Sequence, residues 1–325
     1  MQLLRDADID MAALAGKRVA VLGYGNQGRA QALNLKDSGV DVVVGLRGAS
    51  GSANAAEEAG LTVELVEKAV GSADVIMFLA PDEALAGIYR EVEALIPEGA
   101  AIGFSHGLVI HFGMLRPRDD LDVFLVAPKG PGTALRSLYE QGKGMVGLWA
   151  VAQDTSGRVR DIALAYGKAI GCARAGLIAS SFAEECESDL FNEGAVVWGA
   201  VPEILIAGFE TLIEAGISPE VAYLECVGEL KLLAELVEKR GIAGMREAIS
   251  NTAELGAVLG GPRVVDGSVR EKMREVLAEV RSGRFAEALR KEAESGYKVL
   301  EKARSEAGEK PIERVFDDLQ RLGGN

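Results

Sequence analysis

Short apolar runs alternate with helix-forming stretches along the first half of the chain. Six runs rich in Val, Ile, Leu and Phe predict strands: Lys17–Leu22, Asp41–Leu46, Asp74–Ala80, Ala100–Phe104, Asp122–Ala127 and Met145–Val151. Runs that are apolar throughout, rather than at every second position, are typical of strands buried on both faces. Because they alternate with helical stretches of roughly ten to fifteen residues, they indicate βαβ units. The pattern predicts a Rossmann-like α/β domain with a mostly parallel sheet.

The second half of the chain has a helical pattern instead, beginning at Ser181. We expect helices at 181–215, 218–240, 243–256, 268–280, 283–306 and 311–321, with Gly or Pro at most of the breaks. Ser218-Pro219-Glu220 is a favourable helix start, because proline suits the first helical position. The change of pattern predicts two domains: an α/β domain of residues 1–180 and an all-α domain of residues 181–325.

Composition narrows the class of protein. The chain has 325 residues, of which 48% are hydrophobic and 26% charged, which is typical of soluble globular proteins. No apolar run approaches the ~18–20 residues that span a bilayer, so we expect no membrane segment. A net charge of −14 disfavours nucleic acid and anionic membranes as partners. Three cysteines without a CxxC pair indicate reduced thiols and a cytoplasmic location.

Acidic residues gather in one region, residues 181–230, which contain 11 carboxylates and no Lys, Arg or His. Glu185, Asp189 and Glu193 are spaced four residues apart, so they share one face of a helix, and Glu225 and Glu229 repeat this spacing. Carboxylates without His or Cys suit a hard cation such as Mg²⁺ or Mn²⁺. Five such groups could hold two ions. The alternative is a solvated acidic surface.

A glycine motif, GYGNQG at residues 23–28, follows the first strand and opens a helix. Its glycines permit a tight turn and let a pyrophosphate approach the helix N-terminus, which predicts dinucleotide binding. The ribose-binding acid expected about 20 residues later is absent, and Arg47, Ser50 and Ser52 stand there instead. These residue types suit a 2′-phosphate, so the sequence favours NADP over NAD. A merely polar loop is the alternative.

Two further candidates follow predicted strands. His106 comes directly after Ala100–Phe104, at the carboxyl edge where parallel sheets bind ligands, whereas His111 has more often a structural role at such a position. Lys129 lies between prolines and glycines in the segment APKGPG, which fixes its backbone. The alternatives are a structural histidine and a surface lysine.

Together these segments resemble ketol-acid reductoisomerase (acetohydroxy-acid isomeroreductase) of the short-chain class I. The likeness covers nearly the whole chain and rests on VLGYGNQGRAQALNLKDSG, VVVGLR, PDE at 81–83, SHGLVIHFG, VAPKGPG, ALAYGKAIG, FAEECESDLFNE, AYLECVGELKLL, ISNTAELG and GPRVV. The resemblance implies a Rossmann-like domain followed by a knotted all-helical domain that pairs between two subunits, giving a homodimer or a higher homo-oligomer.

The resemblance also assigns roles to residues. It implies two Mg²⁺ ions held by Asp189, Glu193, Glu225 and Glu229, catalytic roles for His106, Lys129 and Glu185, and a substrate contact at Ser250. The implied NADPH-binding residues are Gly23, Tyr24, Gly25, Asn26, Gln27, Gly28, Arg47, Ser50, Ser52, Asp82, Glu83, Ala84, Leu85 and Gly132. The chain departs from the usual family pattern at Asn192, Gly194, Val227, Gly228 and Leu255, which we expect to affect the preferred alkyl group more than the chemistry.

The activity implied is Mg²⁺-dependent alkyl migration in 2-acetolactate or 2-aceto-2-hydroxybutanoate, followed by reduction with NADPH to a 2,3-dihydroxy acid. These steps belong to valine, leucine and isoleucine biosynthesis. Two other functions are compatible with the pattern. One is a metal-free β-hydroxyacid dehydrogenase, which would leave the carboxylates unexplained, and the other is a non-catalytic nucleotide-binding or scaffold protein.

Overall fold

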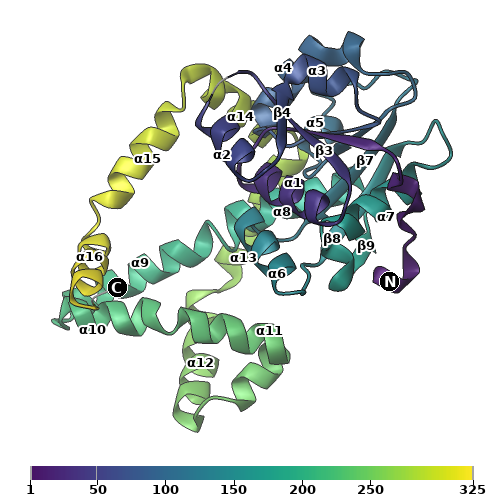
Figure 1. The fold of residues 1–325 in the computed structure, drawn as a ribbon. Helices are drawn as coiled ribbons and strands as arrows, with labels where there is room; N and C mark the ends of the chain where they lie inside the picture. Colours follow the sequence, from purple (N-terminus) through teal and green to yellow (C-terminus); the bar gives the residue numbers. More distant parts are fainter. Residues whose placement is uncertain (1, 49, 324–325) are drawn as a thin grey trace. The chain divides into compact units, whose positions relative to one another are not determined.

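The computed structural model describes residues 2–48 and 50–323 (Figure 1). The chain forms two compact units, Met1–Ser188 and Asp189–Asn325. The division falls inside helix α8 (Phe182–Ala195), a few residues beyond the end at 180 that the sequence predicts. The first unit is an α/β domain and the second is built of helices, as the hydrophobic pattern predicts.

Nine strands form one sheet in the described part of the first unit, in the order β1-β9-β8-β7-β6-β5-β2-β3-β4. Their bounds are β1 Leu3–Leu4, β2 Arg18–Leu22, β3 Asp41–Leu46, β4 Thr62–Leu65, β5 Val75–Phe78, β6 Ala101–Phe104, β7 Asp122–Pro128, β8 Gly147–Gln153 and β9 Leu177–Ala179. Neighbours run parallel except in the pairs β1–β9 and β7–β8, which are antiparallel. The predicted mostly parallel sheet is therefore confirmed.

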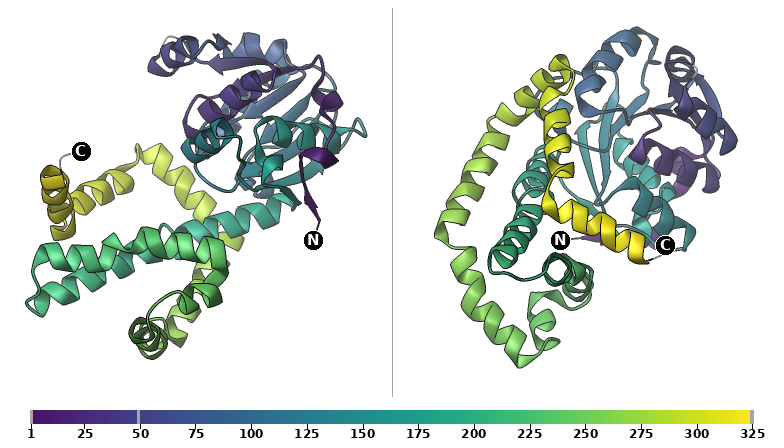
Figure 2. Two further views of the ribbon diagram at one scale, coloured as in Figure 1. Left: turned by 60° about the horizontal axis from the view of Figure 1, so that its bottom comes forward. Right: turned by 90° about the vertical axis from the view of Figure 1, so that its left-hand side faces the viewer.

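Helices cover the sheet on both faces, which buries its central strands completely (Figure 2). The helices are α1 Asn26–Asp37, α2 Gly51–Glu58, α3 Val66–Gly71, α4 Asp82–Val92, α5 Leu108–His111, α6 Gly132–Glu140 and α7 Val159–Ala169. Helix α1 packs on α6 and α7, while α3 packs on α4 and β3. Burial on both faces explains why the strands are apolar at every position.

Three of the nine strands, β1, β4 and β9, lie outside the six predicted runs. β4 is a half-exposed edge strand whose Glu64 forms ion pairs with Arg18 (3.4 Å) and Lys68 (3.0 Å), so it lacks a continuous apolar run. β1 has only two residues and pairs with β9 through Leu3 and Leu4. A strand at the edge of a sheet is less covered by neighbouring elements, so fewer of its side chains are buried and fewer need to be apolar.

The strand order places a crevice at the carboxyl ends of β2 and β5. The chain moves outward from β2 to β3 and β4 on one side and to β5 and β6 on the other. At such a reversal the connecting loops diverge and leave room for a ligand. The glycine motif follows β2, and Pro81 and helix α4 follow β5, so both lie at this crevice.

The second unit contains the rest of α8 and eight longer or shorter helices among the described residues: α9 Ala200–Glu214, α10 Pro219–Tyr223, α11 Leu230–Glu247, α12 Asn251–Val264, α13 Gly267–Arg281, α14 Arg284–Ser295, α15 Lys298–Gly308 and α16 Pro311–Gly323. A π-helical turn, Leu224–Gly228, joins α10 to α11. Gly241 has a φ of 67° and breaks α11 close to the break predicted after residue 240.

Three predicted helices have the wrong bounds. The helix expected at 243–256 is interrupted at residues 248–250, between the end of α11 and the start of α12. The helix expected at 181–215 is divided into α8 and α9 by turns at residues 196–199, where Gly199 lies so close to Gly194 that a Cβ on it would be 1.9 Å from the Gly194 carbonyl oxygen. The helix expected at 283–306 is divided at Gly296 and Tyr297, which have φ values of 79° and 62°. Positive φ ends a right-handed helix, so the chain turns there.

One part of the described chain, Phe182–Glu214, is long and apolar enough to cross a membrane by length and composition alone, although no membrane segment is expected from the sequence. Turns at residues 196–199 interrupt this segment, and it carries Glu and Asp side chains along its length.

Candidate active site

The three glycines of the motif at 23–28 have three different surroundings. A Cβ on Gly23, whose φ is 104°, would lie 2.9 Å from the backbone of Ala80. A Cβ on Gly28 would lie 2.3 Å from the carbonyl oxygen of Gly23, so this glycine permits close packing of α1 on β2. Gly25 has no atom within 4 Å of the corresponding point. This open space is where a dinucleotide-binding loop admits a pyrophosphate.

A cavity of about 280 Å³ extends from this loop and is lined by Arg47 and Ser52. Arg47, Ser50 and Ser52 are all exposed, and the Ser50 hydroxyl accepts a hydrogen bond from the backbone of Ala53 (3.2 Å), capping α2. Glu91 of α4 lines the same cavity, and no pattern in the sequence identifies Glu91 as a site residue. The structure thus brings two of the three predicted 2′-phosphate residues, Arg47 and Ser52, to the cavity beside the glycine motif, together with one acidic side chain.

Other predicted nucleotide residues connect loops to one another. The Asn26 side-chain oxygen accepts a hydrogen bond from the backbone of Thr133 (2.8 Å), and a Cβ on Gly132 would lie 2.1 Å from the Asn26 carbonyl oxygen. The Tyr24 hydroxyl is buried, and burial raises its pKa, although the nearby Arg29 guanidinium acts in the opposite direction. Glu83, Ala84 and Leu85 form the first turn of α4, with Leu85 buried.

A buried polar network lies beneath this loop. The Tyr166 hydroxyl donates to the side-chain oxygen of Gln31 (2.7 Å), and both residues are completely buried. The Gln31 amide donates to the Gln27 side-chain oxygen (3.0 Å) and to the Ser105 hydroxyl (2.9 Å). Ser105 in turn donates to the Val126 carbonyl (2.9 Å). Each side chain named in this network has a hydrogen-bond partner, and a fully satisfied buried network of this kind is rigid.

The network joins the nucleotide loop to both candidate catalytic loops. Gln27 donates to the carbonyl oxygen of Gly130 (2.9 Å), the residue after Lys129. Ser105 immediately precedes His106. The sequence offers one local signal for this arrangement, namely a glutamine on the buried face of α1. Its partners Ser105 and Tyr166 are 74 and 135 residues away along the chain, too far for a local pattern to identify them.

Lys129 and Glu185, which the sequence singles out separately, form an ion pair of 3.3 Å. Lys129 follows β7 and is one-third exposed, whereas the Glu185 side chain is 1% exposed. The other carboxylate oxygen of Glu185 accepts a hydrogen bond from the backbone of Gly107 (2.8 Å). Gly107 has no room for a side chain, because a Cβ would lie 2.3 Å from the Phe182 carbonyl. The glycine thus lets α8 approach the loop after β6.

His106 lies in that loop and pairs with Asp82 through its Nδ1, 2.9 Å from the carboxylate Oδ2. Burial by itself lowers the pKa of His106, but hydrogen bonds to Asp82 and Cys186 and the charges of Asp82 and Glu185 together raise it to about 11. The structure therefore connects a predicted nucleotide contact with a predicted catalytic residue. His111 instead faces Glu187 at 3.4 Å.

A candidate cation site lies on α8 beside the same loop. His106, Glu185 and Asp189 each offer a ligand atom, and these atoms lie within 4.8 Å of one another. Asp189 is one helical turn beyond Glu185 on the continuous helix α8. No other group of three such residues with ligand atoms this close together occurs in the described part of the chain.

Comparison with known proteins decides the family. Residues 13–176 match the family described as "Acetohydroxy acid isomeroreductase, NADPH-binding domain", and residues 182–323 match "Ketol-acid reductoisomerase, C-terminal domain". The structure of an NADH-preferring ketol-acid reductoisomerase from an uncultured archean is 42% identical to this chain, with both chains covered completely and a TM-score of 0.96. The chain belongs to the ketol-acid reductoisomerase family.

Membership of the ketol-acid reductoisomerase family gives the chain a nicotinamide cofactor and a small-molecule substrate. A semialdehyde dehydrogenase NAD-binding protein from Cupriavidus necator shares the fold alone. It is 17% identical with a TM-score of 0.61, and the match covers 82% of this chain and 99% of that one.

The remaining ketol-acid reductoisomerase residues predicted from the sequence lie in the second unit. Glu225 is exposed within the π-helical turn, and Glu229, also exposed, follows it. Ser250 is the N-cap of α12, where its hydroxyl accepts a hydrogen bond from the backbone of Ala253 (3.2 Å). The Ser250 hydroxyl proton is not used in this contact.

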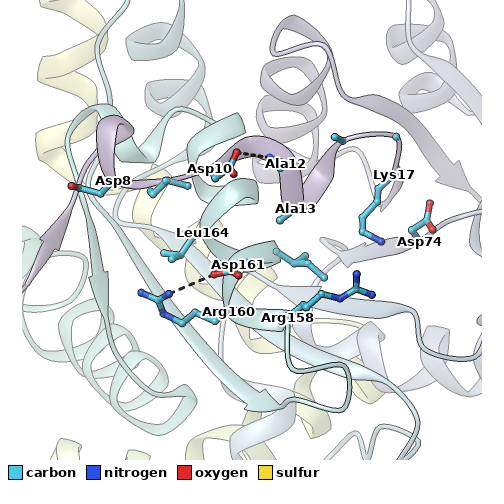
Figure 3. Close-up of a pocket in the computed structure, with 14 residues that line it drawn as sticks. Asp8, Asp10, Ala12, Ala13, Lys17, Asp74, Arg158, Arg160, Asp161 and Leu164 are labelled. Atoms are coloured by element: carbon cyan, nitrogen blue, oxygen red, sulfur yellow. Dashed lines mark hydrogen bonds and ion pairs between the residues drawn. The ribbon is translucent and has the colours of Figure 1, made fainter.

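A larger cavity, of about 640 Å³, lies at the opposite edge of the sheet (Figure 3). Lys17 and Asp74, which line it, precede β2 and β5, so they lie at the amino ends of strands whose carboxyl ends hold the ketol-acid reductoisomerase residues. Its Arg160 pairs with Asp161 at 3.5 Å. The cavity contains none of the predicted site residues, and its size does not make it the active site.

Proposed function

We propose that the chain converts 2-acetolactate and 2-aceto-2-hydroxybutanoate into 2,3-dihydroxy acids, with Mg²⁺ and NADPH, in valine, leucine and isoleucine biosynthesis. The observation that carries this proposal is the buried Glu185 carboxylate, held by Lys129 and by the backbone of Gly107. It places a fixed acid–base group beside His106 and Asp189, at the edge of the sheet that also contains the nucleotide cleft.

The donor set fits a hard divalent cation. Asp189 and Glu193 on α8 and Glu225 and Glu229 around the π-helical turn all offer carboxylate oxygens, which Mg²⁺ prefers. When bound, Mg²⁺ polarises the hydroxyl and carbonyl oxygens of the substrate for the alkyl shift. The local sequence supplies no competing cation, because residues 181–230 contain no Lys, Arg or His.

The side chains of the first unit serve proton transfer. Glu185 can accept the proton of the substrate 2-hydroxyl, and Lys129 stabilises the negative charge of the Glu185 carboxylate at 3.3 Å before that transfer. His106 can donate a proton to the oxygen that becomes the new hydroxyl.

In the second unit, Ser250 keeps a hydroxyl proton that can bind the substrate carboxylate. The nicotinamide supplies the hydride.

A chelator experiment tests this function. Turnover of 2-acetolactate with NADPH should be lost in EDTA and restored by Mg²⁺, and Asp189→Asn should weaken Mg²⁺ binding measured by calorimetry. A metal-free β-hydroxyacid dehydrogenase would keep its activity in EDTA. A scaffold protein would show no turnover at all.

We propose that two copies assemble as part of the same function. The support is the exposure of Glu225 and Glu229 and of many large apolar side chains in the second unit, and we propose that a second copy contributes this carboxylate pair to the site. Mixing the Asp189→Asn and Glu229→Gln chains should then restore some activity through hybrid sites. No recovery after verified subunit exchange would contradict a shared site.

NADPH preference is proposed from the nucleotide cleft. Arg47, Ser50 and Ser52 offer one cation and two hydroxyls to a 2′-phosphate, although Ser50 also caps α2 and Glu91 adds a negative charge. Ser50→Asp with Ser52→Asp should raise the KM for NADPH and spare NADH. The 42% identical structure is of an NADH-preferring enzyme, so an unchanged cofactor ratio would move the preference to other residues.

We propose a cytoplasmic location because none of the three cysteines forms a disulfide. Cys172, Cys186 and Cys226 are all free thiols in the structure, as the sequence spacing predicts. Free thiols persist in reducing compartments. Mass spectrometry of protein isolated under alkylating conditions should find all three reduced.

A further inference from the structure

Asp82 occupies an unusual place for a nucleotide contact. It is the first residue of α4, directly after Pro81, and its carboxylate points to the loop after the neighbouring strand β6. The Asp82 carboxylate lies 2.9 Å from Nδ1 of His106, at hydrogen-bond distance. The Asp82 side chain is 28% exposed and the His106 side chain 17%. The carboxylate therefore interacts with the candidate catalytic loop, on the side of the crevice away from Arg47.

This contact fixes which histidine nitrogen is available. An ionised carboxylate only accepts hydrogen bonds, so Nδ1 of His106 must carry a proton. The ring is then held with Nε2 directed away from Asp82. Nε2 is buried and has no hydrogen bond of ordinary geometry among the described residues, although the Cys186 thiol interacts with the ring. In histidines with such a partner, the second nitrogen is the one that acts on ligands.

We propose that Asp82 is a positioning residue for the reductoisomerase reaction, whose carboxylate holds His106 with Nδ1 protonated and presents Nε2 to the substrate. This inference rests on the proposed function, because it gives Nε2 its substrate. It also separates the roles of two adjacent residues: Pro81 lines the cavity at the glycine motif, whereas the Asp82 side chain orients the catalytic loop.

The chain suits a direct test, because it contains only two histidines, His106 and His111. Nitrogen-15 labelling of histidine in the full-length protein without cofactor gives two imidazole patterns in long-range proton–nitrogen spectra. His111→Asn removes one of them and assigns the other. We expect Nδ1 of His106 to be protonated at pH 7–8 in the wild-type protein, and its signal to shift towards that of an unprotonated nitrogen in Asp82→Ala, because the carboxylate that holds this proton is removed.

Kinetics supply the second readout. Asp82→Ala should lower kcat about 10–100-fold, the usual cost of removing a residue that orients a functional group, with a KM for the substrate nearly unchanged. Asp82→Asn keeps an oxygen that accepts from Nδ1, so its kcat should lie between those of the wild type and Asp82→Ala. The dissociation constant of NADPH should change by less than about threefold. Glu67→Gln is the matched control, since it removes an exposed acid from the first turn of α3.

Three results would overturn the proposal. One is a wild-type spectrum in which Nδ1 of His106 is unprotonated, which decides the matter even if Asp82→Ala does not fold. Another is a His106 pattern that Asp82→Ala leaves unchanged. The last is a loss confined to NADPH affinity, which would make Asp82 a nucleotide contact only. If the proposed function is wrong, the wild-type protein shows no turnover of 2-acetolactate. The nitrogen-15 spectra then still test whether Asp82 orients the His106 ring.

Discussion

The two units of this chain bury their apolar residues very differently. The first unit holds nearly all of the largest fully buried side chains, including Phe78, Phe104, Phe124 and Tyr166. In the second unit Phe209 is the one comparable described residue, and it belongs to a small cluster with Ala222, Ile312 and Val315. Many of its other large apolar side chains are exposed: Trp198 66%, Leu232 57%, Ile242 64%, Leu255 60%, Leu259 63%, Val264 67% and Val299 68%.

This difference indicates that one unit is self-sufficient and the other is not. A monomeric protein seldom exposes so many large apolar side chains on neighbouring helices. The hydrophobic effect makes their exposure costly, at about 25 cal/mol for each Å². The helical unit therefore agrees with the proposed assembly of two copies, in which a second chain covers these side chains.

A charge placed in the exposed apolar set tests whether a second copy covers these side chains. Leu232→Glu should weaken self-association by at least about 100-fold, or ~2.8 kcal/mol, because a carboxylate would have to be buried between copies. Light scattering and 2-acetolactate turnover measure the outcome. Leu65→Glu in the first unit is the matched control, since Leu65 is 58% exposed and Leu232 57%. Equal behaviour of the two variants would remove the distinction between the units.

Truncating a buried ring tests the opposite half of the comparison. Phe124→Ala should destabilise the first unit by about 3–5 kcal/mol, independent of protein concentration, because Phe124 is 0% exposed. Phe285→Ala in the second unit, where Phe285 is 42% exposed, should cost less and depend on concentration. Urea unfolding at two protein concentrations measures both. A concentration-dependent loss for Phe124→Ala would be inconsistent with a self-contained core.

The buried network shows whether the self-sufficient unit also holds the site in position. Gln31→Leu leaves the Tyr166 hydroxyl and the Gln27 oxygen without their partners, at a cost of about 1–3 kcal/mol, and should lower kcat as the loops after β6 and β7 loosen. Gln141→Leu, at an exposed glutamine of the same unit, is the control. Unchanged kcat with reduced stability would make the network purely structural.

Thiol labelling gives the smallest and most local comparison. Burial raises the pKa of Cys172 to about 12, so little thiolate exists at pH 7 and the residue should react only when the first unit unfolds. Burial also raises the pKa of Cys226, but this side chain is half-buried in the second unit. Cys226 should therefore react first, and faster on dilution, as peptide mass spectrometry would show. Comparable rates would argue that both units open together.

The sequence predicts the first unit better than the second for a physical reason. Strands buried on both faces need apolar residues at every position, so β5, β6 and β7 are readable from the chain alone. The half-exposed β4 carries no such requirement and is missed. In the second unit the helices are predicted but their lengths are not, since a close approach of Gly199 to Gly194 ends a helix without any change of pattern.

Site residues show the same limit. Glu185 and Lys129 are each marked by local chemistry, but their ion pair joins positions 56 residues apart. The bond between Asp82 and His106 spans 24 residues and links two strands that are neighbours only in the folded sheet. Propensity and spacing describe what is near along the chain. Which groups meet is decided by strand order, which the resemblance supplies and periodicity does not.

The open space at Gly25 has a consequence for how the chain can change over generations. Substitution at Gly23 or Gly28 would force backbone atoms together, so the altered protein would be removed by cellular quality control before its activity mattered. Gly25 has an ordinary φ and no neighbour within 4 Å, so Gly25→Ala folds without strain. That change should therefore be felt only as weaker nucleotide binding. Of the three glycines, Gly25 is needed for the predicted binding alone, whereas Gly23 and Gly28 are needed for folding.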